Sequence, residues 1–142
     1  MRILIDADAC PSITEIEKIA QQHNIECLIF CDYNHHIYSD YSQVNIIDAG
    51  YQSVDMALIN QVTKGDIVIT QDYGLATLTL SKCGYAVSPN GMIFDEKNID
   101  SLMAVRHIKA KIRSHTHLKG PRKRTKQDEI NLIKSIVYLI NK

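Results

Sequence analysis

The alternation of short apolar runs with segments of helical periodicity constrains the fold of this chain more than any other feature. Runs of strand type cover about residues 2–5, 25–31, 44–49, 66–70 and 85–88. Between them, apolar residues recur at helical spacing, as at Ile13, Ile16, Ile19 and Ala20. This alternation predicts βαβ units, and therefore an α/β fold with a mostly parallel sheet of about five strands.

Capping and turn residues delimit the predicted helices. Ser53 is placed to cap a helix that ends near Gly65, and residues 75–83 predict a further helix. Two helices are expected in the C-terminal part, over about 99–113 and from about Thr125 to the end. Thr125 and Asp128 have the spacing of a capping box, which supports the second start.

Length and composition predict a single globular domain. The chain has 142 residues, of which 45% are hydrophobic and 23% charged, so it is not expected to be disordered. No apolar run approaches the ~18 residues that cross a bilayer, and the early Asp6 argues against a signal peptide. Four cysteines without a Cys-x-x-Cys pair do not form a secreted disulfide framework. We therefore expect that the protein does not associate with a membrane and that it is located in the reducing cytoplasm.

The net charge of zero conceals a strong asymmetry along the chain. Residues 1–105 carry five basic and fourteen acidic residues, a net charge of −9. Residues 106–142 carry eleven basic and two acidic residues, a net charge of +9. An acidic body can concentrate metal cations and a basic segment can bind a polyanion, although a basic segment can also serve only solubility.

Aspartates follow the predicted strands where a parallel sheet binds its ligands. Asp6 and Asp8 follow the first strand, Asp72 follows the fourth, and Asp55 lies in the first turn of the helix after the third. Because ligands of such sheets bind beyond the carboxyl ends of the strands, we expect these four side chains to converge. Converging carboxylates repel one another and need a compensating cation, for which Mg²⁺ or Mn²⁺ is suited. Each aspartate alone could instead be a helix cap.

Three further residues have open roles. Asp48 lies near the end of the third strand and Asp66 begins the fourth, but the sequence does not show whether either side chain reaches the cluster. Cys10 lies near a helix start, which predicts a lowered thiol pKa, although no histidine is identified as its partner.

The C-terminal basic residues predict a surface that binds phosphates. They are Arg106, Lys109, Arg113, Arg122, Lys123 and Arg124. The first three are three and four residues apart, so they share one side of a helix beside an apolar stripe that runs from Ile99 to Ile112. Next to the acidic edge, such a surface would hold the phosphates that flank a scissile bond. Otherwise it is a solvated helix face and linker.

Four segments together resemble a known bacterial family. They are DADACP at residues 6–11, ITQDYGLA at 69–76, SPNG at 88–91 and GPRKRTKQD at 120–128. Over nearly its whole length the chain resembles the YaiI/YqxD family of uncharacterised proteins, which is grouped with PIN-like and NYN-type metal-dependent ribonuclease domains. The resemblance implies a Rossmann-like, PIN-like three-layer α/β/α sandwich. It implies one such domain over residues 1–142, with a basic C-terminal helical part at about 98–142.

The resemblance also implies roles for individual residues. Asp6 matches the first-strand aspartate of PIN-like sites, and Asp72 matches their Thr-x-Asp element, with Thr70 as its companion. Asp55 resembles their mid-chain acidic residue, whereas Asp8 is shared with the YaiI/YqxD pattern but not with every PIN-like domain. Asp6, Asp55 and Asp72 would hold Mg²⁺ or Mn²⁺, with Asp8 as a supporting catalytic residue. No organic cofactor is expected.

The leading hypothesis is therefore a metal-dependent ribonuclease, a hydrolase that acts on RNA phosphodiester bonds. One alternative is a non-catalytic RNA-binding or adaptor protein on a degenerate nuclease fold. Another is a phosphatase with an aspartyl nucleophile, because the Asp6-x-Asp8 spacing also fits that chemistry.

Overall fold

Five parallel strands form the centre of the computed structural model, which describes residues 1–34, 37–48, 50, 53–115 and 123–142 and leaves out the side chains of 112–115. The strands occur in the order β3-β2-β1-β4-β5, and all four pairings are parallel. Their bounds are β1 Arg2–Asp6, β2 Glu26–Asp32, β3 Gln43–Ile47, β4 Ile67–Ile69 and β5 Tyr85–Val87. The predicted α/β fold with five parallel strands is confirmed.

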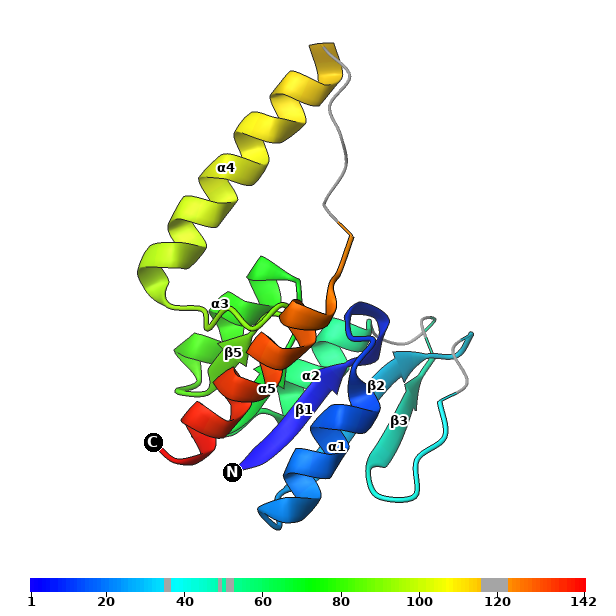
Figure 1. The fold of residues 1–142 in the computed structure, drawn as a ribbon. Coiled ribbons are helices and arrows are strands. Elements are labelled where there is room, and N and C mark those ends of the chain that lie inside the picture. The colour runs from blue at the N-terminus through cyan, green and yellow to red at the C-terminus, as the bar shows by residue number, and fades with distance from the viewer. Residues whose placement is uncertain (35–36, 49, 51–52, 116–122) are drawn as a thin grey trace.

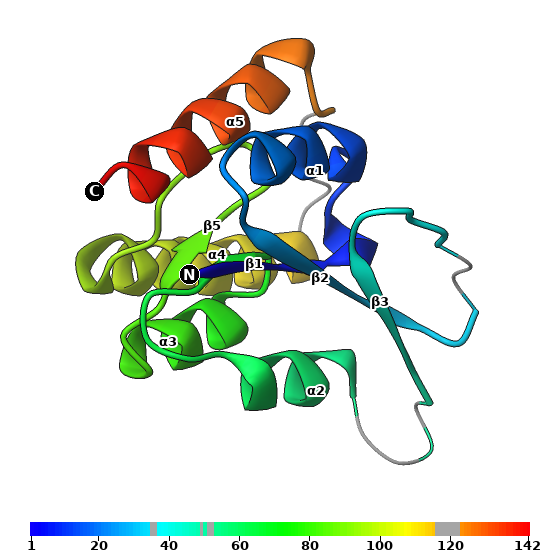
Figure 2. The same ribbon diagram turned by 90° about the horizontal axis from the view of Figure 1, so that it is seen from below.

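Helices cover both faces of the sheet, which gives three layers (Figure 2). One face carries α1 (Ile13–Gln22) and α5 (Lys126–Ile140), and the other carries α2 (Val54–Gln61) and α3 (Tyr73–Ser81). Ser53 caps α2 through Met56 N, and Thr125 forms the predicted capping box with Asp128 at the start of α5. The Rossmann-like α/β/α arrangement is confirmed. None of the helices in the described ranges combines the length and hydropathy needed to span a membrane.

Strand β1 is buried on both faces because its side chains alternate between two cores. Ile3 and Ile5 pack in the core beneath α1 and α5, whereas Leu4 packs in the core beneath α2 and α3. All three side chains are fully buried. Such two-sided burial explains why this strand appears in the sequence as a continuous apolar run rather than as an alternating one.

The long helix α4 (Glu96–His115) extends beyond the carboxyl-terminal edge of the sheet (Figure 1). It begins three residues earlier than predicted, because Asp95 and Asn98 exchange hydrogen bonds between side chain and backbone N–H at 2.8 and 2.7 Å. Among the described side chains of its apolar stripe, those at the base pack against the body and those further along do not. Ile99 is 3% exposed, whereas Val105 and Ile108 are 46% and 56% exposed.

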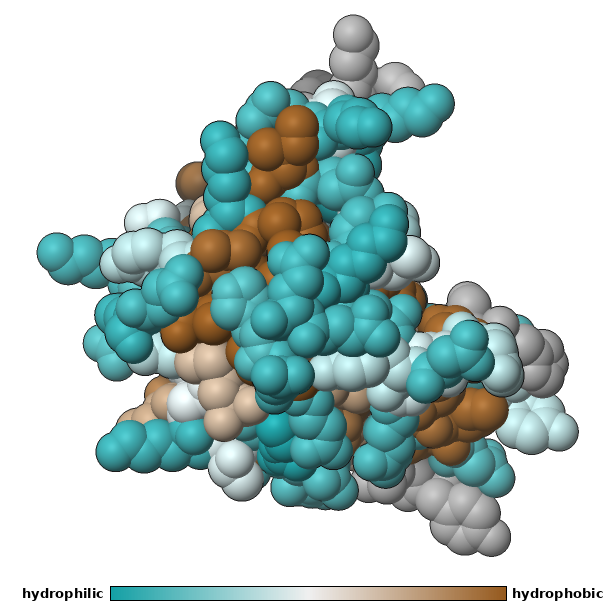
Figure 3. Space-filling model, turned by 60° about the horizontal axis from the view of Figure 1, so that its bottom comes forward, coloured by the Kyte–Doolittle hydropathy of each residue, from teal (hydrophilic) through white to brown (hydrophobic). Residues whose placement is uncertain are grey.

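Hydrophobic side chains also reach the surface elsewhere. Figure 3 shows patches of them among hydrophilic side chains on the face seen from below. In addition to those on α4, the exposed large apolar side chains include Ile46 on β3 and Ile130 on α5. Apolar atoms make up a large share of the accessible surface of globular proteins, so this exposure does not by itself identify a binding site.

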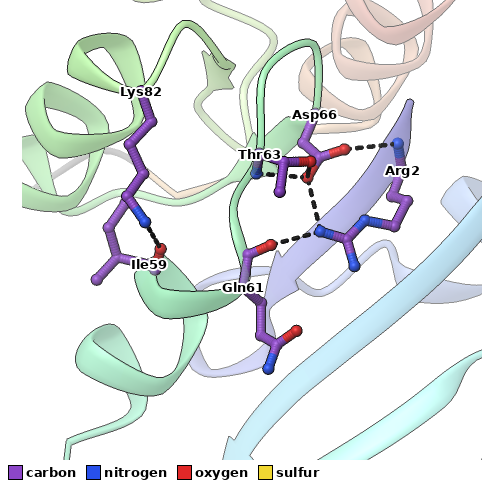
Figure 4. Close-up of polar contacts among 6 residues, drawn as sticks. All are labelled: Arg2, Ile59, Gln61, Thr63, Asp66 and Lys82. Atoms are coloured by element: carbon purple, nitrogen blue, oxygen red, sulfur yellow. Dashed lines mark hydrogen bonds and ion pairs between the residues drawn. The ribbon is translucent and has the colours of Figure 1, made fainter.

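Asp66 organises the opposite, amino-terminal edge of the sheet (Figure 4). Its carboxylate accepts hydrogen bonds from Arg2 N at 3.0 Å, Arg2 Nη2 at 2.9 Å and Thr63 N at 2.8 Å. Burial alone would raise the pKa of Asp66, but these hydrogen bonds and the charge of Arg2 outweigh it and lower that pKa. The contacts join the start of β1 to the loop between α2 and β4, so Asp66 has a structural role.

We expect Asp66→Asn to lower the free energy of unfolding by about 2 kcal/mol near neutral pH, because it removes a buried, charge-assisted acceptor. The lowered pKa means that this stabilisation is present above about pH 4 and is lost as pH falls through the folded-state pKa. Urea unfolding at neutral and acidic pH measures the effect, with exposed Asp48→Asn as the control. An equal loss at both pH values would contradict the assignment.

Candidate active site

The strand order reverses direction at β1, and the candidate site lies at this point. From β1 the chain adds β2 and β3 on one side, and later β4 and β5 on the other. In open α/β sheets the crevice beyond the strand ends at such a reversal is where ligands bind. Asp6 is the last residue of β1, and Thr70 directly follows β4. The register pairs Ile5 with Ile69, so the next residues, Asp6 and Thr70, lie side by side.

Thr70 connects the two aspartates that the sequence places at these strand ends. Its Oγ1 donates a hydrogen bond to Asp6 Oδ2 at 3.2 Å and accepts one from Asp72 N at 3.0 Å. Thr70 is fully buried and Asp6 is 8% exposed. A hydroxyl has a single proton, and Thr70 donates it to Asp6 while it accepts from Asp72 N. This hydrogen bond restrains the orientation of the Asp6 carboxylate. Thr70 therefore positions Asp6 and the backbone of Asp72 relative to each other.

Asp72 caps helix α3 and also belongs to the acidic cluster. Its Oδ1 accepts a hydrogen bond from Leu75 N at 3.1 Å, as the alternative interpretation of a helix cap predicts. Burial raises its pKa, but hydrogen bonds from Leu75 N and Asp55 outweigh this effect and lower it. Asp72 is therefore a carboxylate at neutral pH. The capping role and the cluster role coexist because a carboxylate has two oxygens.

The carboxyl group of Asp55 is hydrogen-bonded to that of Asp72. Burial, the hydrogen bond to Asp72 and the charges of Asp72, Asp6 and Asp8 raise the pKa of Asp55 to about 6. Asp55 lies in the first turn of α2, and its neighbour Asp72 lies at the start of α3. Two helix starts therefore bring one carboxylate each to the same place.

The cluster also includes Asp6 and Asp8. Burial raises the pKa of Asp6, the Thr70 hydrogen bond opposes this, and the charges of Asp8 and Asp72 raise it further. Asp8 is exposed in the short 3₁₀ helix η1 (Ala7–Ala9). The structure thus brings together Asp6, Asp8, Asp55 and Asp72. Within the described ranges, no group of three or more His, Cys, Asp or Glu side chains is arranged so that it could hold a metal ion.

The other candidates from the sequence lie outside this cluster. Asp66 is at the opposite edge of the sheet, and Asp48 is exposed and accepts a hydrogen bond from Gly50 N at 2.9 Å. The lowered pKa predicted for Cys10 is wrong. This thiol is 3% exposed, and burial raises its pKa to about 11. Cys10 is therefore a protonated core residue at neutral pH.

One of the predicted basic residues reaches the cluster. The guanidinium carbon of Arg106 lies 5.8 Å from the centroid of the Tyr73 ring, and its charge helps to lower the pKa of Asp72. Lys109 and Lys123 are exposed. Arg124 donates from Nη2 to Pro89 O at 3.1 Å, so it is not a freely solvated residue. The side chain of Arg113 and all of Arg122 lie outside the described residues.

We expect Asp55→Asn to stabilise the metal-free protein near neutral pH. The raised pKa means that native Asp55 costs stability as pH rises from about 4 through 6, whereas asparagine is neutral throughout. After allowance for solvent screening, the free energy of unfolding should rise by about 1 kcal/mol. Urea unfolding in chelator at acidic and neutral pH measures it, with Asp48→Asn as the control. A destabilised variant at neutral pH would refute the proposed repulsion.

Comparison with known proteins places this cluster in a family without an assigned activity. The UPF0178 protein of Clostridium tetani is 50% identical over 143 residues, which covers 100% of this chain and 98% of the relative. The UPF0178 protein of Clostridium novyi is 47% identical over 143 residues, which covers 100% and 96%. That of Clostridium acetobutylicum is 46% identical over 132 residues, which covers 91% and 89%.

No solved structure matches the chain. The family model described as "Uncharacterized BCR, YaiI/YqxD family" matches residues 4–142, which includes every residue of the acidic cluster. Together with relatives that are about half identical over their full length, this match shows that the protein belongs to the YaiI/YqxD family.

Proposed function

We propose that this protein is a metal-dependent ribonuclease of PIN-like type that acts at the Asp6, Asp8, Asp55 and Asp72 cluster. One observation carries the proposal. Four carboxylates meet at the carboxyl-terminal edge of a parallel sheet, at its strand-order reversal, and two of them are close enough to share a proton. Such an arrangement costs stability, so a function that uses the charge is the simplest reason for it.

The donor set fits a hard divalent cation. Carboxylate oxygens are preferred by Mg²⁺ and Mn²⁺, and a cation would take the place of the proton between Asp55 and Asp72. Asp6, Asp55 and Asp72 would hold the ion, with Asp8 at the exposed side. When bound, such an ion supplies charge neutralisation on a phosphodiester and favours ionisation of water.

Hydrogen bonds hold two of the proposed ligand side chains in position. Thr70 holds Asp6 through its hydroxyl, and the amide of Leu75 holds one oxygen of Asp72. These contacts fix the two carboxylates before any ligand arrives, which is the condition for a geometrically defined site. The same hydrogen bond and the 8% exposure of Asp6 disfavour the alternative in which Asp6 is a phosphatase nucleophile.

The charge distribution supports a polyanionic substrate. Arg106 lies beside Asp72, and Lys109 is exposed one turn further along α4. Since α4 extends beyond the edge that carries the aspartates (Figure 1), these cations would meet the phosphates that flank the bond to be cleaved.

Calorimetry with Mn²⁺ or Mg²⁺, followed by cleavage of single-stranded RNA, tests the proposal. Asp6→Asn and Asp72→Asn should each weaken metal binding by about tenfold or more and abolish cleavage, because each removes a ligand. Asn still caps helices, so Asp72→Asn should remain folded. The control Asp48→Asn should bind metal and cleave RNA as the native protein does. RNA binding that ignores metal and both variants, without cleavage, would instead favour the non-catalytic adaptor.

A second experiment tests the substrate surface. Lys109→Gln should weaken single-stranded RNA binding and reduce the slope of log affinity against log salt by about 0.7, as expected for one lost phosphate contact. Lys64 is an exposed lysine close to the opposite edge of the sheet, so Lys64→Gln is the matched control. Equal effects of the two substitutions would mean that RNA affinity depends on the net charge of the protein and not on the position of Lys109.

A further inference from the structure

A cavity of about 420 Å³ lies next to the acidic cluster and is not used by the proposed metal site. Gln71, which lines it, stands between Thr70 and Asp72, and Ser88, which also lines it, directly follows β5. The cavity therefore opens at the same edge of the sheet as the aspartates. Its volume is within the range of small-molecule sites, about 300–1,000 Å³.

One wall of the cavity is apolar and aromatic. Tyr73 and Phe94 form it with Met92 and Leu102. The two rings pack edge to face, with centroids 5.9 Å apart and an interplanar angle of 66°. Phe94 is buried at 3% exposure, and the guanidinium of Arg106 lies over the Tyr73 ring. These contacts hold the wall in place before a ligand binds.

The rim presents amide groups from two loops. The turn at residues 88–91 is attached to α5, because Ser135 Oγ donates a hydrogen bond to Gly91 O. A second hydrogen bond, from Met92 N to Ser88 Oγ at 3.0 Å, closes the turn itself. Gly91 has a φ of +92°, and a Cβ there would lie 2.5 Å from the backbone of Asn131, so the turn requires glycine. The carboxamide oxygen of Asn90 accepts from Ser88 Oγ. Gln71 is exposed at the opposite loop.

Arg124 contributes an unused hydrogen-bond donor. Its Nη2 is held by Pro89 O at 3.1 Å, which fixes the guanidinium against the turn. Its Nε is buried and, among the described residues, has no hydrogen-bond partner. Since Arg124 also lines the cavity, its guanidinium can donate to an acceptor on a ligand there. The neighbouring Asp128 carboxylate caps α5 through Thr125 N at 2.9 Å.

We propose that this cavity binds the base of one unpaired nucleotide, next to the phosphate held at the acidic cluster. The proposal deepens the proposed ribonuclease function and rests on it for the identity of the polymer. The base would pack on the Tyr73 and Phe94 wall, and its polar edge would accept from the Arg124 guanidinium and meet the Gln71 and Asn90 amides.

A base fits this set of groups better than a phosphate does. Proteins that recognise single-stranded RNA combine aromatic surfaces with side chains that hydrogen-bond the edges of splayed bases. A bare phosphate would leave the apolar wall without a partner and would lie against the Asp128 carboxylate. Gln71 is the direct neighbour of Asp72 in the chain. A nucleotide whose base occupies the cavity would therefore have its sugar and phosphate at the aspartates.

The test uses the full chain in chelator, so that neither metal nor cleavage is needed. Calorimetry compares the four nucleoside 5′-monophosphates with ribose 5-phosphate, which lacks a base. At least one nucleotide should bind about tenfold more tightly than ribose 5-phosphate, and it should displace a short single-stranded RNA. Arg124→Met should weaken binding of that nucleotide by about tenfold, whereas Lys64→Met, at an exposed lysine close to the opposite edge of the sheet, should not.

Gln71→Ala keeps the experiment decisive if Arg124→Met is unstable, because Gln71 is exposed. It should change the ranking of the four nucleotides. The proposal is overturned if no nucleotide binds at millimolar concentration, if ribose 5-phosphate binds as tightly as all four, or if both variants retain native affinity. If a nucleotide binds but does not displace the bound single-stranded RNA, the cavity is not part of the RNA-binding site. Because the assay contains chelator, failure of metal binding or cleavage would refute the ribonuclease function without altering this result.

Discussion

The pairing of β1 with β2 on one side and β4 on the other determines where the candidate site lies. That pairing places Asp6 beside Thr70 and makes β1 the point at which the strand order reverses. Both faces of β1 are fully buried, so the position of Asp6 is fixed by two hydrophobic cores at once. The remaining carboxylates of the cluster come from a 3₁₀ turn and two helix starts at the same edge.

The two edges of the sheet use aspartate in opposite ways. At the amino-terminal edge, the carboxylate of Asp66 accepts hydrogen bonds from Arg2 and Thr63. These bonds and the charge of Arg2 outweigh the effect of burial, so the pKa of Asp66 is lowered. At the other edge, burial and neighbouring like charges raise the pKa values of Asp6 and Asp55. The fold is therefore stabilised by aspartate at one edge and carries an electrostatic cost at the other, a division that agrees with the proposed function.

The sequence predicted the strands, the parallel sheet and the meeting of the four aspartates, because local periodicity and the strand-end rule decide these features. It did not predict what depends on distant packing. Burial of Cys10 raises a thiol pKa that its place near a helix start had suggested would fall. Periodicity also cannot show whether the apolar stripe on α4 finds a partner, and Val105 and Ile108 of this stripe are exposed. The cavity joins loops after β4 and β5 to α4 and Arg124, so no single motif reveals it.

Helix α4 has a consequence for the size of molecule that this protein can engage. Its 20 residues give a rod of about 30 Å, and all but its base stands clear of the sheet. A ligand that contacts both the aspartate edge and the outer turns of this rod must itself span several nucleotides. Dinucleotides can occupy only the edge. For the RNA substrate proposed above, the length of the helix would therefore set a minimum substrate length, below which the cations on its outer turns would add nothing to affinity.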